Sequence, residues 1–161
     1  MLTLNLVAST IVFAVAAWIY LVPRLRSLPP LVVLQPILLL HAMRHLGMMF
    51  LSPGGTTAGI PEQFTVPAAY GDLIAAVLAM LALFALRAGA RSGRLLLWAF
   101  NVEGSVDLAI AITLATIYNA EPFMGAAYWI PAFWVPALLV THALVFMMLL
   151  GTSSSRHDAI A

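Results

Sequence analysis

Hydrophobic residues in this chain form five long runs, and the short segments between the runs are rich in proline and glycine. These residue types favour turns over helix interiors. Each run has about the 20 residues with which an α-helix crosses a bilayer. The pattern therefore predicts an all-α polytopic membrane protein with five transmembrane helices, at about residues 2–22, 29–51, 66–86, 95–118 and 127–150. We expect one five-helix domain over residues 1–150 and a short polar tail over residues 151–161.

Composition supports a membrane protein. Of the 161 residues, 63% are hydrophobic and 8% are charged, whereas soluble domains are about one quarter charged. A formal net charge of +1 without a basic stripe predicts no nucleic-acid partner. The chain has no cysteine, which excludes disulfides, thiolate metal sites and iron–sulfur clusters. Arginine without lysine, in a chain rich in alanine and leucine, is typical of a GC-rich bacterial genome, so we expect a bacterial inner-membrane protein with the lipid bilayer as its partner.

The distribution of arginine predicts the orientation. The first and third connections and the tail carry arginine, whereas the second and fourth connections carry only the acidic residues Glu62 and Glu121. Cytoplasmic loops of membrane proteins are enriched in arginine and lysine. This rule places the N-terminus outside and the C-terminus in the cytoplasm. An odd number of spans requires the two ends to lie on opposite sides of the membrane, which agrees with this placement. The arginines concerned are Arg24, Arg26, Arg87, Arg91, Arg94 and Arg156.

Seven ionisable residues interrupt the apolar runs. They are costly in hydrocarbon, so they face protein or a water-filled cavity and are functional by default. At a rise of about 1.5 Å per residue, basic and acidic members fall at matching depths on different helices. Arg44 and Asp72 form such a match, and we expect them to form a structural ion pair. The seven residues are His41, Arg44, His45, Asp72, Glu103, Asp107 and His142.

The leading hypothesis is a buried site that binds a metal ion, haem or a small lipophilic ligand. A spacing of four places His41 with His45, and Glu103 with Asp107, on shared helix faces. Imidazole and carboxylate ligands suit zinc, iron or manganese. We therefore expect His41, His45 and His142 to bind, with Asp107 and Glu103 as further ligands. A b-type haem would take His142 and one histidine of the second run as axial ligands, and depth favours His41.

Two alternatives use the same side chains differently. In a membrane enzyme, His41 with Asp107 or Glu103 would move a proton on an isoprenoid, sterol-like or quinone substrate, with Asn101 as an orienting group. In a proton or ion path, the ionisable residues would form a relay. A single five-helix chain would then work as a homo-oligomer or as a subunit of a larger membrane complex. The purely structural reading, in which the pairs only hold the helices in register, also stands.

Overall fold

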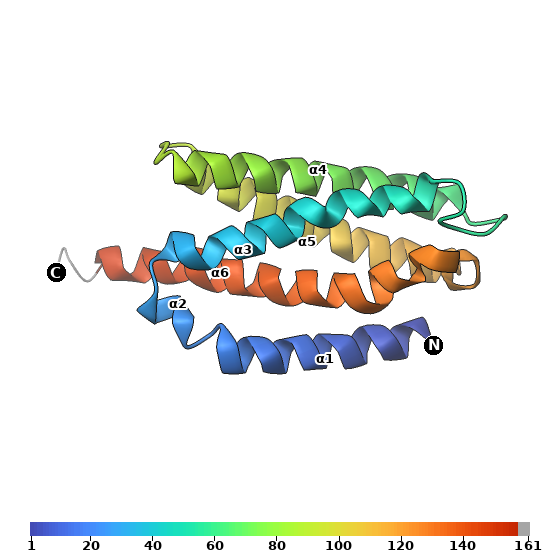
Figure 1. The fold of residues 1–161 in the computed structure, drawn as a ribbon, viewed down its shortest axis with the longest axis horizontal. Coiled ribbons are helices and arrows are strands. Elements are labelled where there is room, and N and C mark those ends of the chain that lie inside the picture. The colour runs from blue at the N-terminus through green and yellow to red at the C-terminus, as the bar shows by residue number, and fades with distance from the viewer. Residues whose placement is uncertain (158–161) are drawn as a thin grey trace.

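The computed structural model describes residues 1–157, apart from the side chains of Arg26 and residues 152–157. Every regular element in this part of the chain is helical (Figure 1). The elements are α1 Leu2–Tyr20, α2 Arg24–Ser27, α3 Pro30–Ala42, the 3₁₀ helix η1 Met43–Leu51, α4 Glu62–Arg87, α5 Gly93–Ile117, the 3₁₀ turns η2 Glu121–Phe123 and η3 Gly125–Tyr128, the π-helical turn η4 Ile130–Trp134, and α6 Val135–His157.

Five helical stretches are long and apolar enough to cross a membrane, which confirms the predicted number. They are Leu2–Tyr20, Pro30–Leu51, Glu62–Arg87, Gly93–Ile117 and Gly125–Gly151. The third stretch begins four residues before the predicted start, because hydropathy marks the apolar part of a helix and misses its polar first turn. For the same reason, α6 continues to His157 past the predicted end at residue 150. Residues 158–161 of the predicted tail lie outside the described part of the chain.

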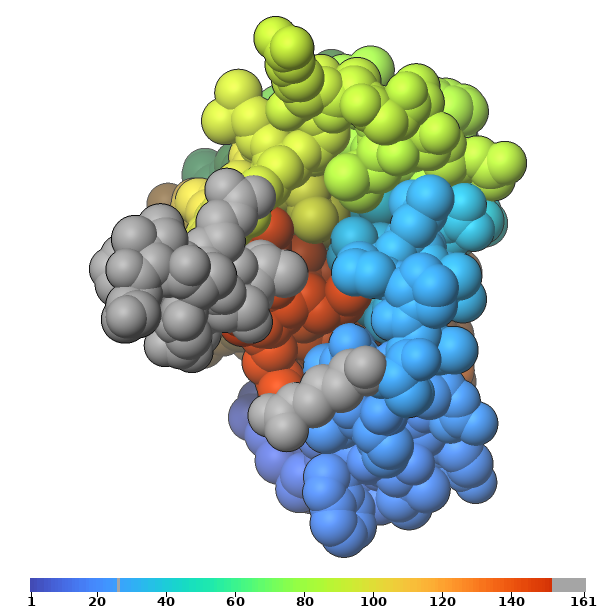
Figure 2. Space-filling model, turned by 90° about the vertical axis from the view of Figure 1, so that its left-hand side faces the viewer, coloured from blue at the N-terminus to red at the C-terminus, as the bar shows by residue number. Residues whose placement is uncertain are grey.

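The helices form a bundle in which α1 lies at one edge. α1 packs against α6 and η4, and its only buried residue is Ala17. α4 packs against α5, α3 and η1, and α6 packs against both α3 and α5. Viewed along the bundle, α1 and α4 lie at opposite edges with α3 and α6 between them (Figure 2). Four helical stretches, α3–η1, α4, α5 and α6, therefore surround the centre.

The two ends of the bundle differ in charge, and we name them accordingly. The basic end holds Arg24, Arg87, Arg91 and Arg94 and lies on the left of Figure 1. The acidic end, on the right, holds the start of α1, the connection 52–61 and the segment 118–129. Backbone hydrogen bonds tie the last two together: Thr57 N donates to Phe123 O at 2.9 Å, and Ala127 N donates to Gly55 O at 2.9 Å.

The half of the bundle nearer the basic end is filled with apolar side chains. Leucines of α3 pack there against alanines of α4, and Phe100 of α5 is fully buried. Small alanines let helices approach closely, and dispersion contacts are then dense. This cluster comprises Val33, Leu34, Ile37, Leu38, Ala79, Ala82, Leu83, Leu97, Phe100, Val145 and Leu149.

Candidate functional site

A change of helix type in the second span positions the central side chain of the site. α3 ends at Ala42 and continues as the nine-residue 3₁₀ helix η1. With three residues per turn, this helix buries Arg44, Gly47 and Phe50 along one face. His45 falls outside that face and is exposed, and its one hydrogen bond within the described part of the chain joins Nδ1 to the carbonyl of Ala42 at 3.0 Å. The expectation that His41 and His45 share a face is therefore wrong, because it assumed 3.6 residues per turn.

Arg44 is the hub of a buried polar cluster. Its side chain is fully buried, and its Nε donates to Asp72 Oδ1 at 2.7 Å. Its Nη2 donates to Asp107 Oδ2 at 2.5 Å, and its Nη1 donates to the carbonyl of Gly104 at 3.2 Å. One guanidinium thus joins η1, α4 and α5. The structure places Arg44 and Asp72 in direct contact, and it adds Asp107 as a second carboxylate partner.

Three glycines make room for this cluster. A Cβ atom on Gly47 would overlap the side chain of Asp72, and one on Gly71 would overlap the carboxylate of Asp107. A Cβ atom on Gly104 would lie 2.7 Å from Arg44 Nη1 and 2.7 Å from the ring of His142. The charged side chains therefore occupy space that only glycine leaves free.

His142 of α6 completes the cluster, and its hydrogen bonds determine its tautomer. Asn101 Nδ2 donates to the backbone carbonyl of His142 at 3.3 Å, so Asn101 Oδ1 accepts from His142 Nδ1–H at 2.7 Å. The lone pair on Nε2 then faces Arg44 Nη1 at 3.4 Å. Asn101 therefore orients a neutral imidazole. His142 is turned toward Arg44 as a hydrogen-bond acceptor.

His41 lies beside His142 and has a different partner. The two rings are 4.2 Å apart between centroids, and Phe100 packs against both. The single hydroxyl proton of Thr141 goes to the carbonyl of Ala137 at 2.8 Å, so His41 Nε2–H donates to Thr141 Oγ1 at 2.9 Å. His41 Nδ1 is buried and has no hydrogen-bond partner among the described residues.

Glu103 is the third acidic residue of the region. It is half-buried, within electrostatic reach of Arg44 and Asp72, and its Oε2 atom is buried without a hydrogen-bond partner in the described part of the chain. In the described part of the chain, no hydrogen bond joins His41 to Glu103 or to Asp107: its Nε2 bonds to Thr141, and its Nδ1 has no partner. The acid–base couple suggested for an enzyme stays a prediction.

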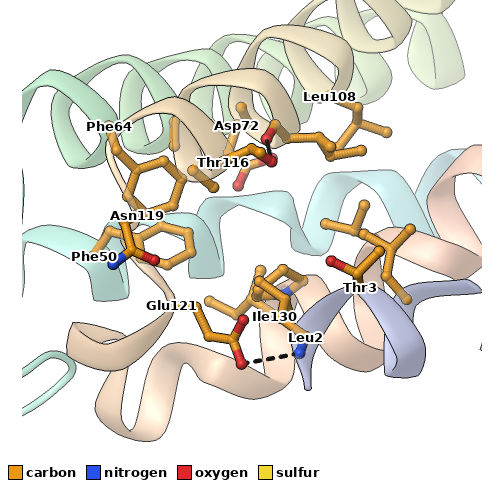
Figure 3. A pocket seen from close by; sticks show the side chains of 17 residues that line it. Leu2, Thr3, Phe50, Phe64, Asp72, Leu108, Thr116, Asn119, Glu121 and Ile130 are labelled. Atoms are coloured by element: carbon orange, nitrogen blue, oxygen red, sulfur yellow. Dashed lines mark hydrogen bonds between the residues drawn. The ribbon is translucent and has the colours of Figure 1, made fainter.

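A cavity of about 320 Å³ extends from Asp72 toward the acidic end. Such volumes are typical of small-molecule sites. Figure 3 shows Asp72 at one side of the space and Leu2 and Glu121 across it. The cavity lies between α1, α4, α5 and the π-helical turn. It is lined by Leu2, Thr3, Leu6, Phe50, Phe64, Ala68, Asp72, Leu108, Ala111, Ile112, Ala115, Thr116, Asn119, Glu121, Ile130, Pro131 and Val135.

A hydrogen-bonded carboxylate lines the end of the cavity away from Asp72. Glu121 Oε1 accepts from the amino group of Met1 at 2.9 Å and from Leu2 N at 3.0 Å. These hydrogen bonds, first of all the one from the amino group, hold the pKa of Glu121 below its usual range. Glu121 thereby fastens the start of α1 to the segment that follows α5.

The arrangement does not form the expected metal or haem sites. Among the residues that the structure describes, no three histidine, aspartate or glutamate side chains are placed to share a metal ion. The Nε2 lone pair of His142 faces a guanidinium, and His45 lies outside the cluster. The rings of His41 and His142 touch directly, which leaves no space for a porphyrin between them.

Sequence reasoning placed the ionisable residues on four helices but missed the residues that organise them. Gly47, Gly71 and Thr141 were overlooked, and so was the cavity. A signal was present for two of them: Gly47 lies three residues after Arg44, and Gly71 directly precedes Asp72. Glycine is unfavourable inside a helix, so its position beside a buried charge indicates a close approach.

Comparison with known proteins identifies a family without assigning an activity. No curated protein and no solved structure matches the chain. A family model described as a domain of unknown function, DUF8737, matches residues 1–150. The match includes the first four long helices and nearly all of the fifth apolar stretch, and the chain therefore belongs to the DUF8737 family.

Proposed function

We propose that this protein is a multi-pass membrane protein that binds a small lipophilic molecule in the cavity beside Asp72. The observation that carries the proposal is the combination of an apolar-walled space and a carboxylate held by Arg44 at its inner end. Ligand sites in proteins are largely apolar and contain a few convergent polar groups that orient the ligand. The Arg44 cluster would serve as the rigid support for that polar contact.

The proposed setting is the bacterial inner membrane, with the N-terminus outside. The arginine-rich connections support a cytoplasmic basic end, and the acidic end would then face outward. In this orientation the cavity lies in the outer half of the membrane. From Phe64 to Asp72 it follows α4 over about 12 Å, at 1.5 Å per residue. A lipophilic molecule could reach it from the outer leaflet.

The test is to identify what the protein retains after gentle purification. Native mass spectrometry of the detergent-solubilised protein should detect a bound lipophilic molecule. Ala115→Leu places a larger side chain in the cavity wall, about 12 Å along α5 from Asp107, and it should abolish retention. Ala109→Leu is the matched control, because Ala109 is exposed on the same helix.

Equal retention by the two leucine variants would contradict the proposal. An absorption spectrum and elemental analysis of the same sample test the haem and metal hypotheses independently. We expect no Soret band and no stoichiometric metal, because Asn101 and Arg44 engage both nitrogens of His142 and no three histidine or carboxylate side chains among the described residues are placed to share an ion.

A further inference from the structure

The charged and aromatic groups around the cavity indicate which headgroup it would accept. The two ionisable side chains among its lining residues are both acidic, Asp72 and Glu121, and none of the described lining residues is lysine, arginine or histidine. The rings of Phe50 and Phe64, which also line the cavity, contact each other edge to face with their centroids 5.0 Å apart. Carboxylates attract cations, whereas the aromatic rings offer an apolar contact surface.

Asp72 has unused hydrogen-bonding capacity in this wall. The residue is 8% exposed, and Arg44 Nε engages its Oδ1. Its Oδ2 has no hydrogen-bond partner in the described part of the chain and occupies the space that Gly47 leaves free. A carboxylate has about four acceptor positions, so Asp72 can accept a donor from a ligand without releasing Arg44.

The balance of basic and acidic groups in the buried cluster also favours a cationic ligand. Arg44 is the one guanidinium within electrostatic reach of Asp72, Glu103 and Asp107 in the described chain. Buried charges are stable when they are paired. A single cation faces three carboxyl groups, so a cationic ligand would find hydrogen-bond acceptors there, whereas an anionic ligand would not find a cation of its own.

We propose that the ligand is an amphiphile with a protonated amine headgroup, whose ammonium group binds Asp72 and whose apolar part lies between α1, α4 and α5. This inference rests on the proposed lipophilic site and specifies its headgroup. The ammonium donates to the carboxylate of Asp72, and the apolar part contacts Phe50, Phe64 and Ala115. Glu121 and its hydrogen-bond partners would lie at the end of the ligand opposite its ammonium group.

An isosteric series tests the headgroup separately from the cavity. Binding of 4-phenylbutylamine, 4-phenylbutanol and 4-phenylbutanoate is measured by calorimetry on purified protein in detergent, with empty micelles subtracted. We expect the amine to bind at least about tenfold more tightly than the alcohol, because a charge-assisted hydrogen bond replaces a neutral one. The carboxylate should bind most weakly. Ala115→Leu should abolish binding, whereas Ala109→Leu should not.

Asp72→Asn should reduce the affinity for the amine to that for the alcohol. If this variant does not fold, the comparison of amine and alcohol in the unaltered protein decides the question alone. Equal binding of amine and alcohol that Ala115→Leu abolishes would overturn the headgroup inference and leave the proposed site intact. Binding that Ala115→Leu does not change, or no binding of any probe, would overturn the proposed site itself.

Discussion

Small alanine side chains lie inside both halves of the bundle, but they pack closely in one half and line a cavity in the other. Near the basic end, Ala79 and Ala82 of α4 are fully buried against leucines of α3. Near the acidic end, Ala68 of α4 and Ala115 of α5 line an unfilled space. Both halves are apolar and helical, so neither hydrophobicity nor helix propensity explains the difference.

The two halves differ in the backbone conformation of the segments that face these alanines. In the basic half, α3 is a regular α-helix whose leucines reach the alanines of α4. In the acidic half, the second span has become a 3₁₀ helix that turns Arg44 and Gly47 toward α4. The last span begins with a π-helical turn at Ile130–Trp134. π-helical turns are frequent at functional sites, and this one borders the cavity.

The largest expected effect comes from removing the hub. Arg44→Met leaves Asp72 and Asp107 buried without their cation. Breaking a buried ion pair from one side costs about 3–5 kcal/mol. We expect a large fall in the thermal unfolding midpoint, measured by circular dichroism in detergent. Arg91→Met is the control, because Arg91 is exposed at the basic end.

A rescue variant sharpens this prediction. Combining Arg44→Met with Asp72→Asn and Asp107→Asn removes all three charges of the ion pairs, so much of the lost stability should return. If Arg44→Met unfolds at the same temperature as Arg91→Met, the cluster does not hold the helices together.

Replacing an alanine by leucine should change the free energy of unfolding in opposite directions in the two halves. Ala79→Leu adds atoms to a filled core, which costs about 1–3 kcal/mol of the free energy of unfolding. Ala115→Leu adds the same atoms beside the cavity and should gain about 0.5–2 kcal/mol. The unfolding midpoints are compared on protein stripped of bound lipophilic molecules. A loss of similar size in both variants would show that the acidic half is as closely packed as the basic half.

The smallest expected effect concerns Glu121 and is pH-dependent. Because hydrogen bonds lower the pKa of Glu121 in the folded protein, its contribution is present above its ordinary pKa of 4.5 and is lost as the pH falls through the lowered value. In Glu121→Gln, the thermal unfolding midpoint should therefore fall less as the pH is lowered through the acid range. Glu62→Gln, at an exposed position of the same end, should not. Identical acid profiles for the two variants would contradict a stabilising role for Glu121.

Some of the site could be predicted from the sequence because it depends on the cost of burying charge. Ionisable residues in apolar spans must find partners, which led to the ion pair of Arg44 with Asp72. The individual hydrogen bonds between the nitrogens of Arg44 and the carboxylate oxygens could not be predicted in this way. The expected histidine pair depended on an assumed helix geometry, and the 3₁₀ turn moved His45 out of the cluster. Asn101 was suggested as an orienting group of an enzyme, which stays a prediction, and in the structure it hydrogen-bonds to His142.

The five apolar helices, and the gathering of most of the ionisable residues at their centre, could be predicted from the order of the amino acids. Both follow from the cost of placing unsatisfied backbone or charged groups in hydrocarbon. The packing of the helices against one another determines that Arg44 occupies the middle, that the two buried imidazoles touch, and that a cavity opens beside Asp72. These features depend on which side chains face one another across different helices, and a periodicity within one helix does not contain that information.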